Sequence, residues 1–322
     1  MHLEHCLPAL ARQSRMADEV IVIDNGSADG SVEWLAREHP RVRVVALNEN
    51  RGFSGGNAAG YKVATGDAIV LLNNDTAPES DWLERLAAAA ESDVRIGIVA
   101  SLMTTWNGVR IDSAGDGVKV SGRGFQHCKF FPVASGRPSG RTFSACAGAA
   151  LYKRAVLEDV GFLEDRFFMN CEDTDLSFRA RLRGWEVWYC AEAKVCHRVS
   201  ASQKVGSSNN VFYNARNHIW VYLRCMPLLL MIKWFPCFMA DLVMIAVNPY
   251  DKERLTAYIR GVAAGFACLP WVWEQRKKIQ ARRVVGLKEL DGLLSRPQPW
   301  KRICAEWHKR RAPQQPDFDI SW

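Results

Sequence analysis

The chain has 322 residues, of which 48% are hydrophobic and 24% are charged, so it is globular and can bury a sizeable core. Its ten cysteines form no C-x-x-C pair, which argues against a disulfide framework and against a zinc site built from cysteines. A polar, helix-like stretch follows Met1, so a signal peptide is not expected and a reducing cytoplasm is the simplest location.

The net charge of +7 is concentrated in the last third of the chain. Residues 216–322 hold 18 Lys and Arg against 9 Asp and Glu, including basic groups at 276–278, 282–283 and 309–311. Such an excess suits nucleic acid, an anionic membrane surface or solubility alone. Because the positive charge avoids the rest of the chain and follows an apolar segment, nucleic acid is the least favoured partner, and none is predicted.

Short apolar strands alternate with amphipathic helices over the first hundred residues. A helix is predicted at 2–14, strands at 19–27, 42–48, 68–72 and 96–103, and helices at 31–40, 52–66 and from Ser80, a candidate N-cap, to 90. The apolar run at 68–72 is typical of a strand buried on both faces. This alternation indicates right-handed crossovers, a parallel sheet and the α/β class.

Polar residues follow three of these strands. Asp24 ends the first strand, residues 48–52 follow the second, and Asn73-Asn74-Asp75 follows the strand at 68–72. An isolated Asn-Asp pair is usually a turn. Ligands of open α/β sheets, however, bind outside the carboxyl ends of the strands. Three polar strand exits on one edge therefore favour a site.

A second group of acidic residues begins a predicted helix at 172–185. It contains Glu172, Asp173 and Asp175, which is more than helix capping requires, although Asp175 could simply pair with Arg179 one turn later. Around it we predict loops and a hairpin at 104–145, a strand and a helix at 144–161, and one or two strands at 186–199. His197 ends that last region and, with Asp75, would complete a site for a divalent cation.

Residues 211–247 are mainly aromatic and aliphatic. Charged residues interrupt them, so no run reaches 18 apolar residues and a membrane-spanning helix is not expected. Two alternatives stay open: helices that lie in a membrane interface with snorkelling Lys and Arg, or a helical subdomain packed on the sheet. The predicted division is an α/β domain at 1–210 and a helical, basic and aromatic region at 211–322.

Five motifs, taken together and in order, carry a family resemblance: "VIDNGSADGS", "NRGFSGGNAAGYKVATGD", "LLNNDT", "GFLEDRFFMNCEDTDLSFRARLRGW" and "AKVCH". The sequence resembles family 2 glycosyltransferases of the GT-A fold, in particular bacterial rhamnosyltransferase-like enzymes, over roughly residues 1–220. The resemblance implies a mostly parallel, Rossmann-like sheet flanked by helices that binds a nucleotide-diphospho-sugar.

The resemblance also implies roles for individual residues. The implied donor-binding residues are Asp24, which would accept from the imino N–H of uracil or thymine, with Arg51, Asn57 and Asn74. The implied ligands of Mg²⁺ or Mn²⁺ are Asp75, His197 and the amide oxygen of Asn73. Asp173 occupies the position of the catalytic base, with Glu172 beside it. Glu172 and Asp175 are expected to raise the proton affinity of Asp173 by their negative charge.

The implied reaction is an inverting, metal-dependent transfer of a sugar, by first guess rhamnose, from a UDP- or dTDP-sugar. The acceptor would be a hydroxyl of a bacterial cell-surface glycan or a lipid-linked acceptor, in the cytoplasm or peripherally on the inner face of the plasma membrane. Two alternatives are a sugar-phosphate nucleotidyltransferase, whose Gly-rich phosphate loop with a basic residue is missing after the first strand, and a non-catalytic nucleotide-sugar or glycan binder.

One feature departs from the family pattern. Members usually open with a buried strand of the type "VSVVIVTYN", whereas residues 2–14 already have the pattern of the helix that follows it. The strand at 19–27 would then lack a neighbour and the nucleotide pocket one wall. We expect either a start about a dozen residues upstream or a chain that is less stable and binds its donor weakly.

Overall fold

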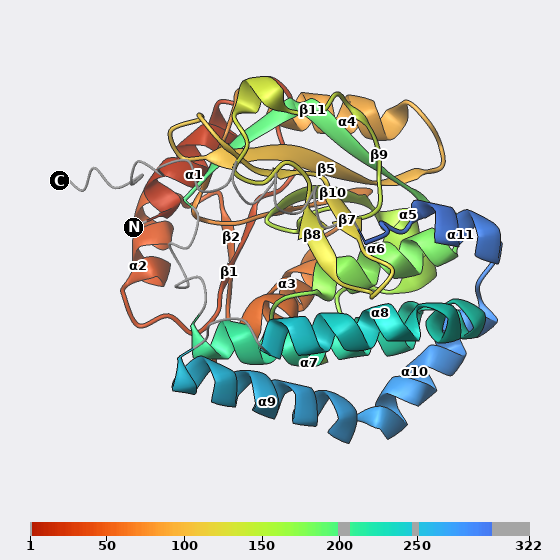
Figure 1. The fold of residues 1–322 in the computed structure, drawn as a ribbon. Helices are drawn as coiled ribbons and strands as arrows, with labels where there is room; N and C mark the ends of the chain where they lie inside the picture. Colours follow the sequence, from red (N-terminus) through yellow and green to blue (C-terminus); the bar gives the residue numbers. More distant parts are fainter. Residues whose placement is uncertain (1, 199–206, 247–250, 298–322) are drawn as a thin grey trace.

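A computed structural model describes residues 2–198, 207–246 and 251–297, which form a sheet flanked by helices with a further layer of helices below it (Figure 1). The helices are α1 (Leu3–Ala11), α2 (Ser31–Glu38), α3 (Gly52–Val63), α4 (Trp82–Glu91), α5 (Arg154–Val160), α6 (Glu172–Leu182), α7 (Ser208–Cys225), α8 (Leu228–Ala246), α9 (Lys252–Ala267), α10 (Leu269–Ala281), α11 (Leu287–Leu293) and the short 3₁₀ turns η1 (Val133–Ser135) and η2 (Asp165–Phe167). The strands are β1 (Ile21–Asp24), β2 (Arg43–Ala46), β3 (Ala68–Leu72), β4 (Thr76–Pro78), β5 (Ile96–Thr105), β6 (Ile111–Ala114), β7 (Asp116–Val118), β8 (Gly124–Gln126), β9 (Gly140–Thr142), β10 (Ala149–Lys153) and β11 (Glu186–His197).

The main sheet has seven strands and mixed directions. Its order is β3-β10-β5-β11-β4, with β6 beside β5 and β9 beside β11. β11 runs parallel to β5, whereas β10 runs antiparallel to both β3 and β5. β3, β5 and β11 therefore run in the same direction, as predicted, but β10 is inserted between β3 and β5 in the opposite direction, so this sheet is mixed and not mostly parallel. The connection between β5 and β10 contains short strands and no helical crossover, so β10 returns in the opposite direction.

The sheet is interrupted between β1 and β3. β1 pairs in parallel with β2 and with no other described strand, and β3 is an edge of the main sheet. A cavity of about 1900 Å³ lies between them, lined by Val20–Ile23 on one side and Ala68–Leu72 on the other. Only Ile69 and Leu71 of β3 are buried, so the expectation of a strand buried on both faces is wrong. As expected from the sequence, β1 has a neighbour on one side only among the described strands.

Most other elements follow the sequence pattern within a few residues. The 104–145 region holds the predicted hairpin, formed by β7 and β8. Ser80 is not an N-cap: α4 begins at Trp82 after Asp81, whose side chain makes no capping bond, and the Leu83 amide donates to Gln13 Oε1 at 2.9 Å. Residues preceding α4 are instead held by the α1 end, where Ser14 N–H donates to the Ser80 carbonyl.

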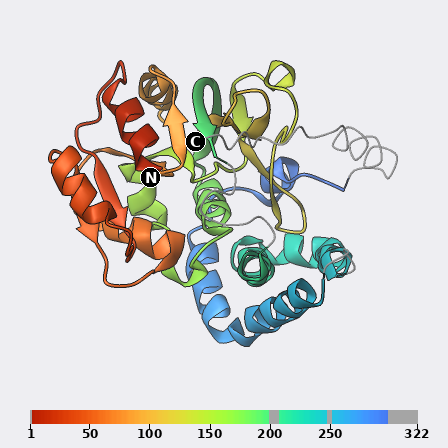
Figure 2. The same ribbon diagram turned by 90° about the vertical axis from the view of Figure 1, so that its left-hand side faces the viewer.

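The helices α7 to α10 form one layer beneath the sheet, seen from a second side in Figure 2 as the teal to blue ribbons. α7 packs on the α/β part, because one apolar cluster contains Ile219 and Tyr222 of α7 together with Phe178 of α6 and Val118 of β7. Of the two alternatives for this region, a helical subdomain packed on the sheet describes α7. A division of the chain at residue 210 remains a prediction.

α8 differs from α7 in its exposure. Within the described residues α8 is the one helix long and apolar enough to cross a membrane, and the bent pair α9–α10 would count as a second only if read as one span. Lys233 and Asp241 interrupt the apolar run but leave the helix predominantly apolar, so the expectation that no helix here spans a membrane stays a prediction. A single such helix is weak evidence for a span.

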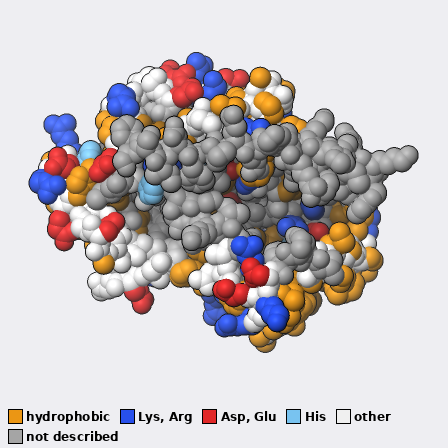
Figure 3. Space-filling model, turned by 60° about the vertical axis from the view of Figure 1, so that its left-hand side comes forward, with side chains coloured by type: hydrophobic (Ala, Val, Ile, Leu, Met, Phe, Trp, Pro, Cys, Tyr) orange, Lys and Arg blue, Asp and Glu red, His pale blue; other side chains and the backbone are white. Residues whose placement is uncertain are grey.

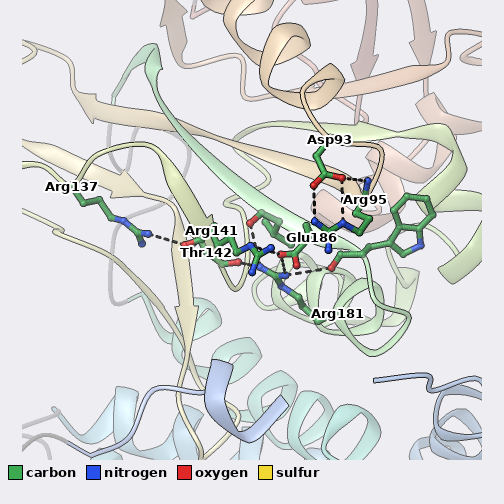
Figure 4. Close-up of polar contacts among 9 residues, drawn as sticks. Asp93, Arg95, Arg137, Arg141, Thr142, Arg181 and Glu186 are labelled. Carbon is green, nitrogen blue, oxygen red and sulfur yellow. Dashed lines mark hydrogen bonds and ion pairs between the residues drawn. The ribbon is translucent and has the colours of Figure 1, made fainter. Parts of the chain in front are cut away.

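A buried arginine fixes the far end of α6, away from the cavity (Figure 4). Arg181 donates to the carbonyls of Thr142 in β9 and Val187 in β11 and forms an ion pair of 2.6 Å with Glu186. Its side chain is 3% exposed, so these contacts are shielded from solvent. Arg181 thereby joins α6 to two strands and sets the position of the acidic residues at the other end of the helix.

Arg181→Met is expected to destabilise the fold by about 3 kcal/mol, because it removes one partner of a buried ion pair and leaves Glu186 and two carbonyls underpaired. Denaturant unfolding would measure the change. Arg141→Met is the matched control: Arg141 lies 3.6 Å from the same Glu186 but is 60% exposed, so its loss should cost under about 1 kcal/mol. Equal losses in the two variants would contradict this account of α6.

Candidate active site

The predicted site residues meet, with one exception, around the cavity of about 1900 Å³. Those that line it are Asp24, Asn57, Asn73, Asn74, Asp75, Glu172, Asp173 and His197. Arg51 is outside this lining and pairs with Asp165 at 3.1 Å on the surface. Its role in donor binding stays a prediction, as do the individual roles of the other residues.

A hydrogen-bonded turn follows β1, which forms one wall of the cavity. Asp24, buried at the end of β1, accepts from the Ser27 amide at 3.2 Å. The Asn25 side chain donates to the Gly52 carbonyl at 2.9 Å and accepts from the Arg51 amide at the same distance. These bonds join the end of β1 to the start of α3. They hold the carboxylate of Asp24 in place although β1 has a neighbouring strand on one side only.

His197 lies between two acidic side chains. Its Nε2 is 3.4 Å from Asp75 Oδ1, and its Nδ1 is 2.9 Å from Asp112 Oδ2. The other oxygen of Asp112, Oδ1, lies 3.2 Å from Lys129 Nζ. Burial opposes the charged imidazolium, but the two carboxylates outweigh it and raise the pKa of His197 to about 9. The site therefore favours positive charge at the point where Asp75 and His197 meet.

This arrangement fits a divalent cation. A buried carboxylate and an imidazole face each other, and the second ring nitrogen is held by Asp112, which is how metal-ligating histidines are usually oriented. Asn73 lies against Gly148, where a β-carbon would be 3.2 Å from its amide nitrogen. A neighbouring group on the same cavity, formed by Asp116, Cys146 and Asp173, has ligand atoms within 4.8 Å of one another.

The start of α6 presents two acids, the buried Glu172 and the half-buried Asp173. Asp173 accepts from the amides of Ala147 at 3.2 Å and Thr174 at 2.6 Å. Burial raises the pKa of Asp173, although these bonds oppose the shift. Burial, followed by the charge of Asp173, raises the pKa of Glu172 to about 8. The higher proton affinity of Asp173 thus comes first from burial and not, as the sequence suggested, from acidic neighbours.

Asp175 has a structural role. It forms an ion pair with Arg179 at 2.8 Å, as the i,i+4 spacing allowed, and lies 3.6 Å from Arg224. Burial opposes its ionised form, but Arg224 and Arg179 outweigh it, so the pKa of Asp175 is lowered. Asp175 therefore stays charged and ties α6 to α7.

The loop before α6 is strained and held from α7. Phe168, Asn170 and Cys171 all have positive φ, near 62 to 66°. The buried side chain of Asn217 lies within 3.0 Å of three carbonyl oxygens of this loop, those of Phe167, Met169 and Asn170. Such strain persists only where the surroundings fix it. Asn217 thus positions the residues that precede Glu172 and Asp173.

The comparisons with known proteins agree with this geometry. The family model "Glycosyl transferase family 2" matches residues 2–161, about half of the chain. The chain belongs to glycosyltransferase family 2. It is 27% identical, over 62% of this chain and 73% of the relative, to the N-acetylglucosaminyl-diphospho-decaprenol L-rhamnosyltransferase of Mycobacterium tuberculosis. It is 22% identical, over 62% and 65%, to the Haloferax volcanii low-salt glycan biosynthesis hexosyltransferase Agl10.

Solved structures show that this glycosyltransferase has the GT-A fold. GalNAc-T7, crystallised with UDP, GalNAc and Mn²⁺, matches with a TM-score of 0.59 and 16% identity over 88% of this chain and 55% of its own. This chain thus spans about half the length of that structure. The mannosyltransferase PcManGT of Pyrobaculum calidifontis, with GDP-Man and Mn²⁺, matches with a TM-score of 0.51 and 18% identity over 87% and 79%.

The sequence analysis did not identify three residues that lie in or near the cavity of this glycosyltransferase. Asp112, Asp116 and Asn217 lie in segments assigned to loops or to the apolar helical region. No local motif marks them, because each acts through a partner distant in sequence: Asp112 through His197, Asn217 through the loop before α6. Asp116 faces Asp173, and burial with the charge of Asp173 raises its pKa to about 8.

Asn217→Ala should reduce turnover by about 10²-fold with little change in donor KM, because small displacements of a reacting group have effects of this size. The substitution removes the amide group that donates to the three carbonyls of the strained loop and leaves these carbonyls underpaired. Steady-state kinetics would test it. Asn209→Ala, at an exposed position in the first turn of the same helix, should match the wild type. A rise in KM with unchanged kcat would show that Asn217 serves donor binding instead.

Proposed function

We propose that the protein transfers a sugar, by first choice rhamnose from dTDP-rhamnose, to a hydroxyl of a bacterial cell-surface glycan or lipid-linked acceptor with inversion at the anomeric carbon. The observation that carries this proposal is the shared cavity: the Asp75–His197–Asp112 group and the half-buried Asp173 line it from different elements. The rhamnosyltransferase relative supports the choice of sugar and of a lipid-linked acceptor.

Each residue has a distinct task in this mechanism. Asp75 and His197, with the amide oxygen of Asn73, would hold Mg²⁺ or Mn²⁺, which offsets charge on the leaving diphosphate when bound. Asp24 would accept a hydrogen bond from the uracil or thymine ring. Asp173 takes the proton of the acceptor hydroxyl, and its raised pKa increases its affinity for that proton. Attack from the side of Asp173, opposite the diphosphate, inverts the anomeric centre.

Two features support work in the cytoplasm at the inner face of the plasma membrane. The relatives act in the synthesis of glycans, and one of them is named for an acceptor with a decaprenyl chain. The described cysteines include no disulfide, which suits a reducing compartment.

The test is a panel of nucleotide sugars incubated with the protein and Mn²⁺, with nucleotide release as the readout. UDP- or dTDP-sugars should give slow hydrolysis that Asp75→Ala abolishes, and dTDP-rhamnose should give the largest thermal shift. A nucleotidyltransferase would instead form nucleotide sugar from sugar phosphate and nucleoside triphosphate. A non-catalytic binder would show thermal shifts without any release of nucleotide.

A further inference from the structure

We propose that α8 lies flat on an anionic lipid bilayer and places the acceptor end of the cavity at the membrane surface. The position of this face does not depend on the reaction. That the bilayer carries the acceptor rests on the proposed function.

The outward half of α8 is almost entirely apolar. Within this helix six side chains are more than half exposed: Leu228, Leu229, Ile232, Phe235, Val243 and Met244. Lys233 is the one charged residue among the exposed positions of α8. Figure 3 shows hydrophobic side chains gathered at the lower right of the molecule, where the helical layer lies. A contiguous apolar face of this kind marks an interaction surface and not an ordinary solvated helix.

The inward half of α8 is fixed to the protein. Phe238 stacks on Tyr222 of α7 with 4.1 Å between ring centroids, and Asp241 accepts from Ser121 Oγ at 2.5 Å. Trp234 and Lys233 both donate to Asp291 beyond α10. These contacts are distributed along the helix, so lipid cannot surround it. An interfacial position, with only the outer half immersed, satisfies both halves.

The basic excess of the chain after α8 suits anionic headgroups. The described helices that follow α8 carry exposed Arg260, Lys277 and Lys278, of which Lys278 pairs with Glu274 at 2.7 Å. Arg276 does not contribute, because it is buried and donates to the carbonyls of Leu223 and Met226. Residues 309–311 of the basic tail lie outside the described part of the chain. An anionic bilayer attracts basic side chains, whereas binding to an apolar protein partner does not require them. The basic excess therefore favours a bilayer.

The cavity that holds the reacting groups extends to the inward side of the same helix. Leu242 and Ile245, on the inward side of α8, line the same cavity as Asp173, as does Tyr258 of α9. The Tyr258 hydroxyl donates to the Leu242 carbonyl at 2.7 Å, which fixes the end of α8 at the rim. An acceptor with a long alkyl chain could therefore place its sugar hydroxyl near Asp173 while its chain stays in the bilayer.

The test uses the full chain and vesicles of phosphatidylcholine with or without phosphatidylglycerol, separated by flotation. Wild-type protein should bind the anionic vesicles, and salt should weaken the binding by screening the charges. Val243→Asp, at a position 57% exposed, should reduce partitioning by at least about tenfold, because a carboxylate resists immersion in hydrocarbon. Val109→Asp is the matched control at 58% exposure on the β5–β6 connection and should bind like wild type.

Three results would overturn the proposal: no binding of wild type to anionic vesicles, equal loss in both variants, or a concentration-dependent dimer that Val243→Asp dissociates. The last would assign the face to a second copy of the chain. Donor hydrolysis without vesicles should be the same in wild type and both variants. If the protein binds vesicles but does not hydrolyse the donor, the proposed function alone is rejected. If it hydrolyses the donor but does not bind vesicles, this inference alone is rejected.

Discussion

Asp75→Ala should abolish sugar transfer, with a loss of about 10³-fold or more, because the charge on the leaving diphosphate is then no longer offset. Asp75 is 4% exposed and stands 3.4 Å from His197, so no nearby solvent-exposed group can take its place. Nucleotide binding should weaken in the same variant. Isothermal titration with a nucleoside diphosphate, with and without Mn²⁺, separates the metal-dependent part of the affinity from the rest.

EDTA should have the same effect on the wild-type protein, and added Mn²⁺ should restore activity to the wild type but not to Asp75→Ala. The pKa of His197, raised to about 9, gives a further signature. Below that pH the ring holds a proton that a metal ion must displace, so metal affinity should rise with pH up to about 9. Full activity in EDTA would remove Asp75 and His197 from their roles together.

Asp173→Asn should lower kcat by about 10²–10⁴-fold, the usual effect of losing a general base, while donor binding survives. The substitution keeps the size of the side chain, and its oxygen can still accept from the Ala147 or Thr174 amide. Because burial raises the pKa of Asp173, the carboxylate needed for catalysis forms only above the usual range of an aspartate. Wild-type activity should therefore rise with pH on the acid side, and the variant should lose that limb.

Glu172→Gln provides the comparison. Glu172 is buried beside Asp173, and one of its oxygens has no protein partner among the described residues, so it is the alternative base. If Asp173→Asn abolishes donor binding while Glu172→Gln abolishes turnover, the two roles must be exchanged. If both variants keep wild-type kcat, neither acid takes the proton.

The sequence was sufficient for elements whose identity depends on local pattern. The strand at 68–72 has its predicted ends. His197 and Asp75 meet because β4, which begins directly after Asp75, pairs with the end of β11, where His197 lies opposite Thr76. Asp112 could not be found this way. It lies on β6, a short strand in a Gly-rich region without clear periodicity, and its role depends on a pairing with β5 that only the tertiary fold defines.

The direction of β10 was missed for a related reason. Periodicity indicates that a segment is a strand, but the direction of the strand depends on the path of the connection before it. Here that path includes the β7–β8 hairpin and a bridge from Asp116 to Ser144, and these two residues are distant in sequence. The exposed half of α8 was underestimated because charge counts along the chain do not show which side of a helix each charge occupies.

The interrupted sheet has a consequence for the order in which the protein opens. β1 and β2 form a two-stranded unit, and such units are marginal without packing. Here the packing comes from a small cluster around Leu3, Leu7 and Leu35. Amide hydrogens of Ile21–Asp24 should therefore exchange faster than those of the fully buried β5. Since Asp24 belongs to this unit, a bound nucleotide would slow that exchange, and part of its binding energy would go into consolidating its own pocket.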